Sequence, residues 1–120
     1  MNVLVCGGRD FLDRSVIGPV IDALDPGEDV VIHGGANGAD SLAGLLARQR
    51  GIHTAQVIAL WRLHGPAAGP LRNQAMLHLC PDKVIAFPGG RGTENCIKQA
   101  EALGIPVERV VERSASEGER

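Results

Sequence analysis

The sequence predicts a doubly wound α/β domain, with a five-stranded parallel sheet covered by helices on both faces. Short apolar, β-branched segments alternate with longer segments of helical periodicity along the chain. Three of the apolar segments lead directly into glycine-rich turns, which commonly join a strand to a helix in such folds. Aromatic residues make up only 2% of the chain, so we expect an aliphatic core. The three turns cover residues 6–10, 33–40 and 88–93.

The first half of the chain predicts three strands and two helices. Residues 2–6 form a continuous apolar run, which is typical of a strand buried on both faces. Apolar residues then recur at helical spacing from Asp13, a suitable N-cap, to Leu24, and Pro19 lies inside this segment. By the same criteria we expect a strand at 29–33, a helix at 37–50 and a strand at 54–58.

The second half begins with residues 59–69, which have no periodicity and hold the tryptophan Trp61. We expect a functional loop there, because long irregular segments of compact domains commonly carry binding residues. Pro70 suits the start of the next helix, which we expect to run to residue 79. The remaining predicted elements are a strand at 82–87, a helix at 93–103 and an edge strand at 106–110.

Right-handed crossovers between these parallel strands predict the strand order 3-2-1-4-5. Ligands of such sheets bind beyond the carboxyl ends of the strands, where the order reverses, here between the first and fourth strands. The first and third glycine turns flank that point, and the second lies beside them. We expect one domain over residues 1–112 and a flexible tail over residues 113–120, which are small and charged.

Composition argues against several classes of protein. The net charge is −2 and the basic residues are scattered, so we do not expect nucleic-acid binding. Cys6, Cys80 and Cys96 lie far apart with no CxxC pair, so we expect reduced thiols and neither a metal site nor another cofactor. No apolar run reaches the roughly 20 residues of a membrane span. The chain begins directly with a strand, without a signal peptide, and we therefore expect a cytoplasmic protein.

The glycine turns predict binding of a ligand that carries phosphate or carboxylate groups. Bare N–H groups at a turn and at a helix N-terminus favour negative charge. Arg72 lies near a predicted helix N-terminus, where its charge opposes the helix dipole unless an anion is bound, and Trp61 can stack on a base. The residues that we expect to contact the ligand are Gly7, Gly8, Arg9, His33, Gly34, Gly35, Asp40, Trp61, Arg72, Asn73, Pro88, Gly89, Gly90, Gly92 and Thr93.

Each of these residues also has a purely structural interpretation. The glycines can serve tight turns alone, with Thr93 as an N-cap. Asp40 can be a solvated acid that complements the helix dipole, and His33 can be a buried histidine. Arg9 can form a surface ion pair with Asp13. Trp61 can anchor its loop or fill a contact between subunits.

The chain resembles the SLOG superfamily of small Rossmann-like nucleotide-binding proteins, and within it the DUF2493 or YspA-like group. The resemblance spans about residues 2–110. It implies a nucleotide-type small-molecule ligand, a bacterial or phage source, and a homodimer or higher homo-oligomer. The residues that carry it are Val5-Cys6-Gly7-Gly8-Arg9-Asp10, His33-Gly34-Gly35-Ala36 with Gly38-Ala39-Asp40, Trp61, Ala68-Gly69-Pro70 with Arg72-Asn73 and Met76, and Ala86-Phe87-Pro88-Gly89-Gly90 with Gly92-Thr93.

In the related LOG-type phosphoribohydrolases the third turn reads PGGxGTxxE, and its glutamate is catalytic. This chain matches the pattern as far as Thr93 but has Cys96 at the glutamate position. The resemblance therefore implies that the protein binds a nucleotide or a nucleotide-derived signal, as DprA-like and sensor domains do, and does not cleave it. The alternative is a nucleotide N-glycosidase of the LOG type, with Asp10, Asp40 or Glu94 as the catalytic acid or base.

Overall fold

The computed structural model of the protein describes residues 1–111, so the tail expected over residues 113–120 lies outside the described residues. Its five strands are all parallel and lie in the order β3-β2-β1-β4-β5. The predicted fold class and strand order are therefore confirmed. The strands are β1 (Asn2–Cys6), β2 (Val30–His33), β3 (His53–Gln56), β4 (Lys83–Ala86) and β5 (Val107–Arg109).

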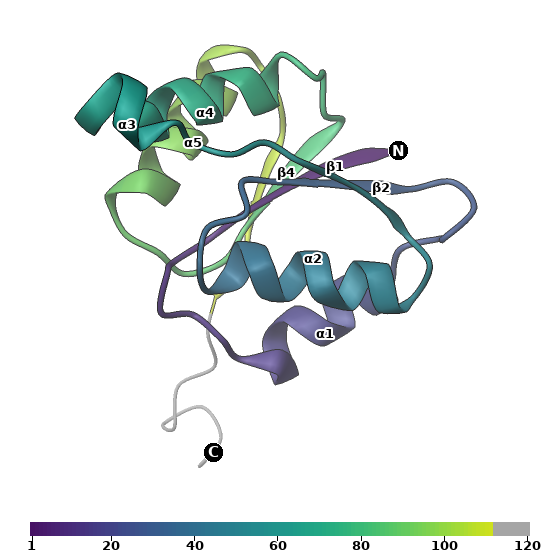
Figure 1. The fold of residues 1–120 in the computed structure, drawn as a ribbon. Coiled ribbons are helices and arrows are strands. Elements are labelled where there is room, and N and C mark those ends of the chain that lie inside the picture. Colours follow the sequence, from purple (N-terminus) through teal and green to yellow (C-terminus); the bar gives the residue numbers. More distant parts are fainter. Residues whose placement is uncertain (112–120) are drawn as a thin grey trace.

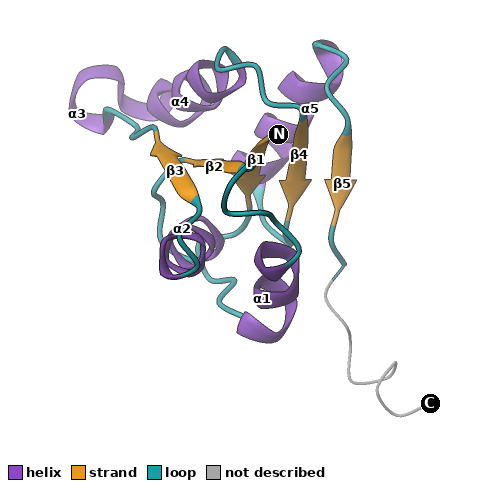
Figure 2. Cartoon of the chain, turned by 90° about the vertical axis from the view of Figure 1, so that its right-hand side faces the viewer, coloured by secondary structure: helices purple, strands orange, loops and turns teal. Residues whose placement is uncertain are grey.

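Helices cover both faces of this sheet (Figures 1 and 2). One face carries α1 and α2, and the other carries α4 and α5, with α3 beyond α4 at the periphery. In the part of the chain that is described, no helix has the length and apolar character needed to cross a bilayer. The helices are α1 (Arg14–Asp22), α2 (Ala39–Gln49), α3 (Trp61–His64), α4 (Ala68–Leu77) and α5 (Arg91–Ala102), and a short 3-10 helix, η1 (Gly65–Ala67), joins α3 to α4.

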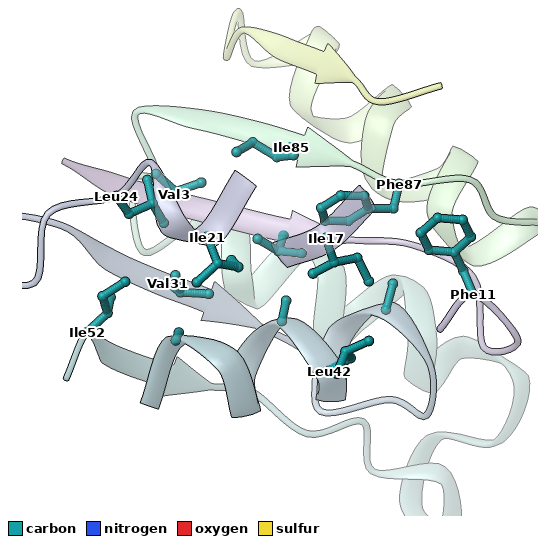
Figure 3. Close-up of a cluster of buried hydrophobic side chains, with 14 residues drawn as sticks. Val3, Phe11, Ile17, Ile21, Leu24, Val31, Leu42, Ile52, Ile85 and Phe87 are labelled. Atoms are coloured by element: carbon teal, nitrogen blue, oxygen red, sulfur yellow. The ribbon is translucent and has the colours of Figure 1, made fainter. Parts of the chain in front are cut away.

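The central strand β1 divides the apolar core into two layers. Its side chains alternate, so that Val3 and Val5 face α1 and α2, whereas Leu4 and Cys6 face α4 and α5. Figure 3 shows the first layer, in which Ile17 of α1 packs over the sheet. Both faces of β1 are fully buried, as its unbroken apolar sequence predicts.

Several helix boundaries differ from the sequence-based predictions. Residues 59–69, expected to be an irregular loop, contain α3 and η1, which are too short to produce a visible periodicity. Helix α4 begins at Ala68 rather than at Pro70; the proline lies in its first turn, where a missing N–H costs no hydrogen bond. Helix α5 begins at Arg91, two residues before the predicted start. Asp13 is the N-cap of α1, as predicted, and accepts a hydrogen bond from the Ser15 amide at 2.9 Å.

Candidate functional site

The carboxyl ends of the central strands open onto a cleft of about 1190 Å³. Residues from all three glycine turns line it, together with parts of α3, η1, α4 and the first turns of α5. The fold therefore brings three segments that are distant in sequence to one place, at the topological switch point of the sheet. The lining consists of residues 6–11, 34–37, 40, 58, 59, 61, 66, 69, 70, 72, 73, 76, 88–93 and 95.

The first turn crosses the other two at such short distances that only glycine fits. A Cβ atom at Gly7 would lie 2.6 Å from the Cβ of Ala39 and 2.9 Å from that of Phe87. The Gly8 amide donates to the Pro88 carbonyl at 2.8 Å, and the Gly8 carbonyl accepts from the Ala39 amide at 3.1 Å. One peptide segment thus joins the first turn to the start of α2 and to the third turn.

The third turn presents unoccupied donors to the cleft. Helix α5 has Gly90 as its N-cap, so no side chain caps it. Within residues 1–111, no amide of residues 89–93 donates a hydrogen bond, and the first amide that does so is that of Glu94, to the Gly90 carbonyl at 3.0 Å. A Cβ atom at Gly90 or at Gly92 would meet nothing within 4 Å. These bare amides and the dipole of α5 together favour an anion at this point.

The second turn holds the side chain of Arg72. The Gly34 amide donates to Asp40 Oδ2 at 2.9 Å, and the Gly34 carbonyl accepts from Arg72 Nη1 at 3.1 Å. Arg72 Nε donates to Asn73 Oδ1 at 3.0 Å. A Cβ atom at Gly34 would overlap the guanidinium group, so the absence of a side chain there lets Arg72 lie against the turn. Arg72 therefore enters the cleft in a fixed orientation, and its Nη2 donates to no group of residues 1–111, which leaves it available for a ligand.

Asp40 is a buried carboxylic acid in the wall of the cleft. Its side chain is only 4% exposed. Burial raises its pKa to about 6, although the Gly34 amide and the charge of Arg72 both act in the opposite direction. The alternative that Asp40 is a solvated acid is therefore wrong. A carboxyl group that titrates near neutrality inside a cleft is a candidate for proton transfer.

Asn73 lines the cleft, but its side-chain amide forms hydrogen bonds to other groups of the protein. It is 2% exposed, accepts from Arg72 Nε, and donates through Nδ2 to the Gly92 carbonyl at 3.2 Å and to Asn95 Oδ1 at 3.1 Å. All three hydrogen-bonding groups of its amide are thus occupied. Asn73 connects α4 to the start of α5 and positions the residues on either side of it.

His33 lies behind the second turn and not in the lining of the cleft. It is 2% exposed, and its Nδ1 accepts a hydrogen bond from the Gly35 amide at 3.1 Å. Its Nε2 has no partner among the described residues and faces Gly44 of α2, where a Cβ atom would lie 2.6 Å away. Burial and the charge of Arg48 lower its pKa, which favours the neutral ring that accepts from Gly35. His33 is thus the buried histidine of the structural interpretation, and it lies outside the lining of the cleft where the sequence predicts a ligand contact.

The alternative function predicts Glu94 as a catalytic carboxylate, but its side chain lies outside the cleft lining. It is exposed and pairs with Arg109 of β5, with oxygen–nitrogen distances of 3.0 and 3.2 Å. The physical reason is helical geometry: Glu94 precedes Cys96 by two positions, which points the two side chains to different sides of α5.

Three further predicted residues, Arg9, Asp10 and Trp61, line the cleft and are exposed. Arg9 and Asp10 are exposed, and the Arg9–Asp13 ion pair considered above is absent from residues 1–111. Trp61 is 57% exposed, and its ring lies over Gly69, with an indole carbon 3.4 Å from the Cβ position there. The exposed indole is accessible for stacking.

The sequence analysis missed several residues of the cleft lining, among them the polar side chains of Asn37, Arg91 and Asn95. Arg91 is the variable residue within the third glycine turn, and Asn95 follows the turn, so neither belongs to the glycine pattern.

Cys96, at the position of the LOG glutamate, is fully buried beneath the cleft. Its contact with Cys6, together with burial, raises the pKa of the Cys6 thiol. The position of the LOG glutamate is thus occupied by a buried thiol and not by a carboxylate.

Two comparisons with known proteins bear on this cleft. Residues 1–64 match a family model described as the YspA, cpYpsA-related SLOG family. The chain is also 41% identical over 116 residues to the Gene 61 protein of Mycobacterium phage D29, a match that covers 88% of this chain and 93% of the phage protein. The name of the phage protein states no activity.

Proposed function

Because the chain belongs to the YspA, cpYpsA-related SLOG family, as its motifs predicted, we propose that its cleft binds a nucleotide or a nucleotide-derived signalling ligand. One observation carries this proposal: the unoccupied amides at the start of α5 share a single cleft with the oriented guanidinium of Arg72. Fixed donors of this kind suit a phosphate group. The cleft volume of about 1190 Å³ is ample for a nucleotide.

The rim of the cleft supports the nucleoside part of this proposal. The indole of Trp61 provides an exposed aromatic face at the cleft, on which a base can stack. Asp10, also at the rim, offers acceptors for sugar hydroxyl groups. In this arrangement the phosphate lies at α5 and Arg72, and the base extends towards α3.

Binding without cleavage is favoured by the residues at the start of α5. The position that carries a catalytic glutamate in the LOG pattern holds Cys96, which is buried, and the neighbouring Glu94 pairs with Arg109 outside the cleft. The protein is then a sensor or a sequestering module. We also propose that it acts in the cytoplasm as a homodimer or higher homo-oligomer, which light scattering combined with size-exclusion chromatography would test.

Isothermal titration calorimetry tests the binding proposal directly. AMP, ADP and adenosine are titrated into the purified protein, and we expect the two nucleotides to bind more tightly than the nucleoside, because only they carry phosphate. Arg72→Gln removes the charge, and we expect it to weaken AMP binding by about tenfold or more. A folded protein that binds none of these compounds at millimolar concentration would exclude the proposal.

A second candidate function is favoured by the raised pKa of Asp40, about 6. In that case the protein hydrolyses a nucleoside 5′-monophosphate: water adds to C1′ of the ribose, the N-glycosidic bond breaks, and the free base and ribose 5-phosphate leave. Asp40, which lines the same cleft as Asp10, would accept a proton from the attacking water and return it to the departing base, so that the base leaves neutral. Incubation with nucleoside monophosphates and chromatographic detection of free base tests this, and turnover that survives Asp40→Asn combined with Asp10→Asn would remove the mechanism.

A further inference from the structure

The side-chain amide of Asn95, in the first turns of α5, has a fixed orientation at the cleft. Its Oδ1 accepts two hydrogen bonds, from Asn73 Nδ2 at 3.1 Å and from Gln99 Nε2 at 2.7 Å. Gln99 Nε2 also donates to the Pro70 carbonyl at 3.1 Å, which ties it to α4. If the Asn95 amide were flipped, its NH₂ group would face two donors, so only one orientation satisfies the network.

This orientation leaves the Asn95 NH₂ group free. Within residues 1–111, Nδ2 of Asn95 donates to no protein group. Among the side-chain nitrogen and oxygen atoms described, the one that is buried without a partner is His33 Nε2. The free NH₂ group of Asn95 is therefore open to solvent, in a residue that lines the cleft. It is a donor that no internal contact requires.

The neighbours of Asn95 at this end of the cleft are also donors. Asn73 lies between Arg72 and Asn95, accepting a hydrogen bond from the first and donating one to the second, so it holds both side chains in place. Among the described residues, nothing accepts a hydrogen bond from Arg72 Nη2 or from the amides of residues 89–93, which are close to Asn95 in sequence. Asp40 lines the same cleft, and its Oδ2 accepts a hydrogen bond from the Gly34 amide. A group that only accepts hydrogen bonds and carries negative charge complements this arrangement.

We propose that Asn95 is a specificity-determining residue that donates a hydrogen bond to a phosphate oxygen of the ligand, beside Arg72 and the amides of α5. This inference rests on the proposed binding function and extends it beyond the glycine turns. Asn95 then selects ligands that present phosphate oxygens there. Through Asn73, the same contact couples the ligand to the position of Arg72.

The substitution Asn95→Asp tests this role with a minimal change in structure. The carboxylate keeps an oxygen in the position of Oδ1, so the hydrogen bonds from Asn73 and Gln99 remain, and only the free NH₂ group becomes an anionic oxygen. We expect the affinity for AMP, measured by calorimetry, to fall by about 100-fold, since a donor is lost and two like charges are brought together. Lys98→Gln is the matched control: it also changes the net charge by −1, on an exposed position of α5 outside the cleft lining.

The outcomes separate this inference from the proposed function. If wild-type protein binds AMP and Asn95→Asp binds it equally well, the role of Asn95 is wrong while the binding function stands. If folded wild-type protein binds no nucleotide, both fail. A second measurement needs no variant: the side-chain amide protons of Asn95 should shift in the NMR spectrum of wild-type protein when AMP is added, and not when adenosine is added. Equal shifts with both compounds would assign Asn95 to the nucleoside and overturn the phosphate contact.

Discussion

The substitution Gly92→Asp should weaken the proposed ligand binding without destabilising the fold. Gly92 is the second residue of α5, its φ is not positive, and a Cβ atom there would meet nothing within 4 Å. Aspartate has a higher helix propensity than glycine by roughly 0.3 kcal/mol. An acidic side chain in the first turn also interacts favourably with the helix dipole, by about 0.3–1 kcal/mol. We therefore expect the variant to be slightly more stable than wild type, with a thermal midpoint about 2–4 °C higher.

Ligand binding should change in the opposite direction. A carboxylate at position 92 would lie at the proposed anion site, where two unit charges about 5 Å apart repel by about 3 kcal/mol at an effective dielectric constant of about 20. That corresponds to a loss of affinity for AMP of about 100-fold. Differential scanning fluorimetry gives the midpoint, and calorimetry gives the affinity.

The matched control for this experiment is Gly18→Asp. Gly18 lies in α1 outside the cleft lining, and a Cβ atom there also meets nothing within 4 Å, so the substitution adds the same charge in a comparably open position. We expect its affinity for AMP to stay within about twofold of wild type, a change of less than 0.5 kcal/mol. If Gly92→Asp binds AMP as tightly as Gly18→Asp does, the anion site does not lie at α5 and the reasoning is refuted.

Three further substitutions test the structure around the cleft. In Gly34→Ala the new methyl group would overlap the guanidinium of Arg72 and displace it; we expect calorimetry to show AMP binding about tenfold weaker, and urea unfolding to show a stability loss of only about 1 kcal/mol. The pKa of Asp40 is raised on folding, from 3.8 to about 6, so its contribution to stability is complete below pH 4 and is lost as the pH rises through 6. In urea titrations, the stability of wild type relative to Asp40→Asn should therefore fall by up to about 3 kcal/mol between pH 4 and pH 7. The titration of His33 affects both proteins equally and cancels in this comparison. A relative stability that does not change with pH would contradict the raised pKa of Asp40. Phe87→Ala removes a ring that is 1% exposed, and we expect urea unfolding to show a loss of about 3–5 kcal/mol, with a loss below 1 kcal/mol arguing against the packing described.

The sequence predicted the layout of the fold because its strongest signals are local. Unbroken apolar runs mark the buried strands, and the glycines after them mark turns that bring the chain close to its neighbours. Arg72 could be identified as a candidate because a cation near a helix N-terminus is unfavourable unless it has an anionic partner. Each of these inferences needs only a short window of sequence.

The rest of the site depends on contacts between elements, which no local pattern reveals. The hydrogen bonds of Asn73 depend on the contact of α4 with the start of α5. The orientation of the Asn95 amide depends on Asn73 and Gln99, which both donate to its Oδ1. The burial of His33 follows from the packing of α2 against β2, which places Gly44 against its ring. Helix α3 was missed because four residues make scarcely more than one turn.

The contacts of Gly8 have a consequence for how the protein could adapt to different ligands. Its amide and carbonyl groups are bound to Pro88 and Ala39, so none of the three turns is free to shift alone. The floor of the cleft is thus preorganised, so the proposed phosphate ligand would cost little conformational entropy on binding. Divergence in ligand preference among relatives should then arise at the periphery, around Trp61, while the inner loops tolerate almost no insertion.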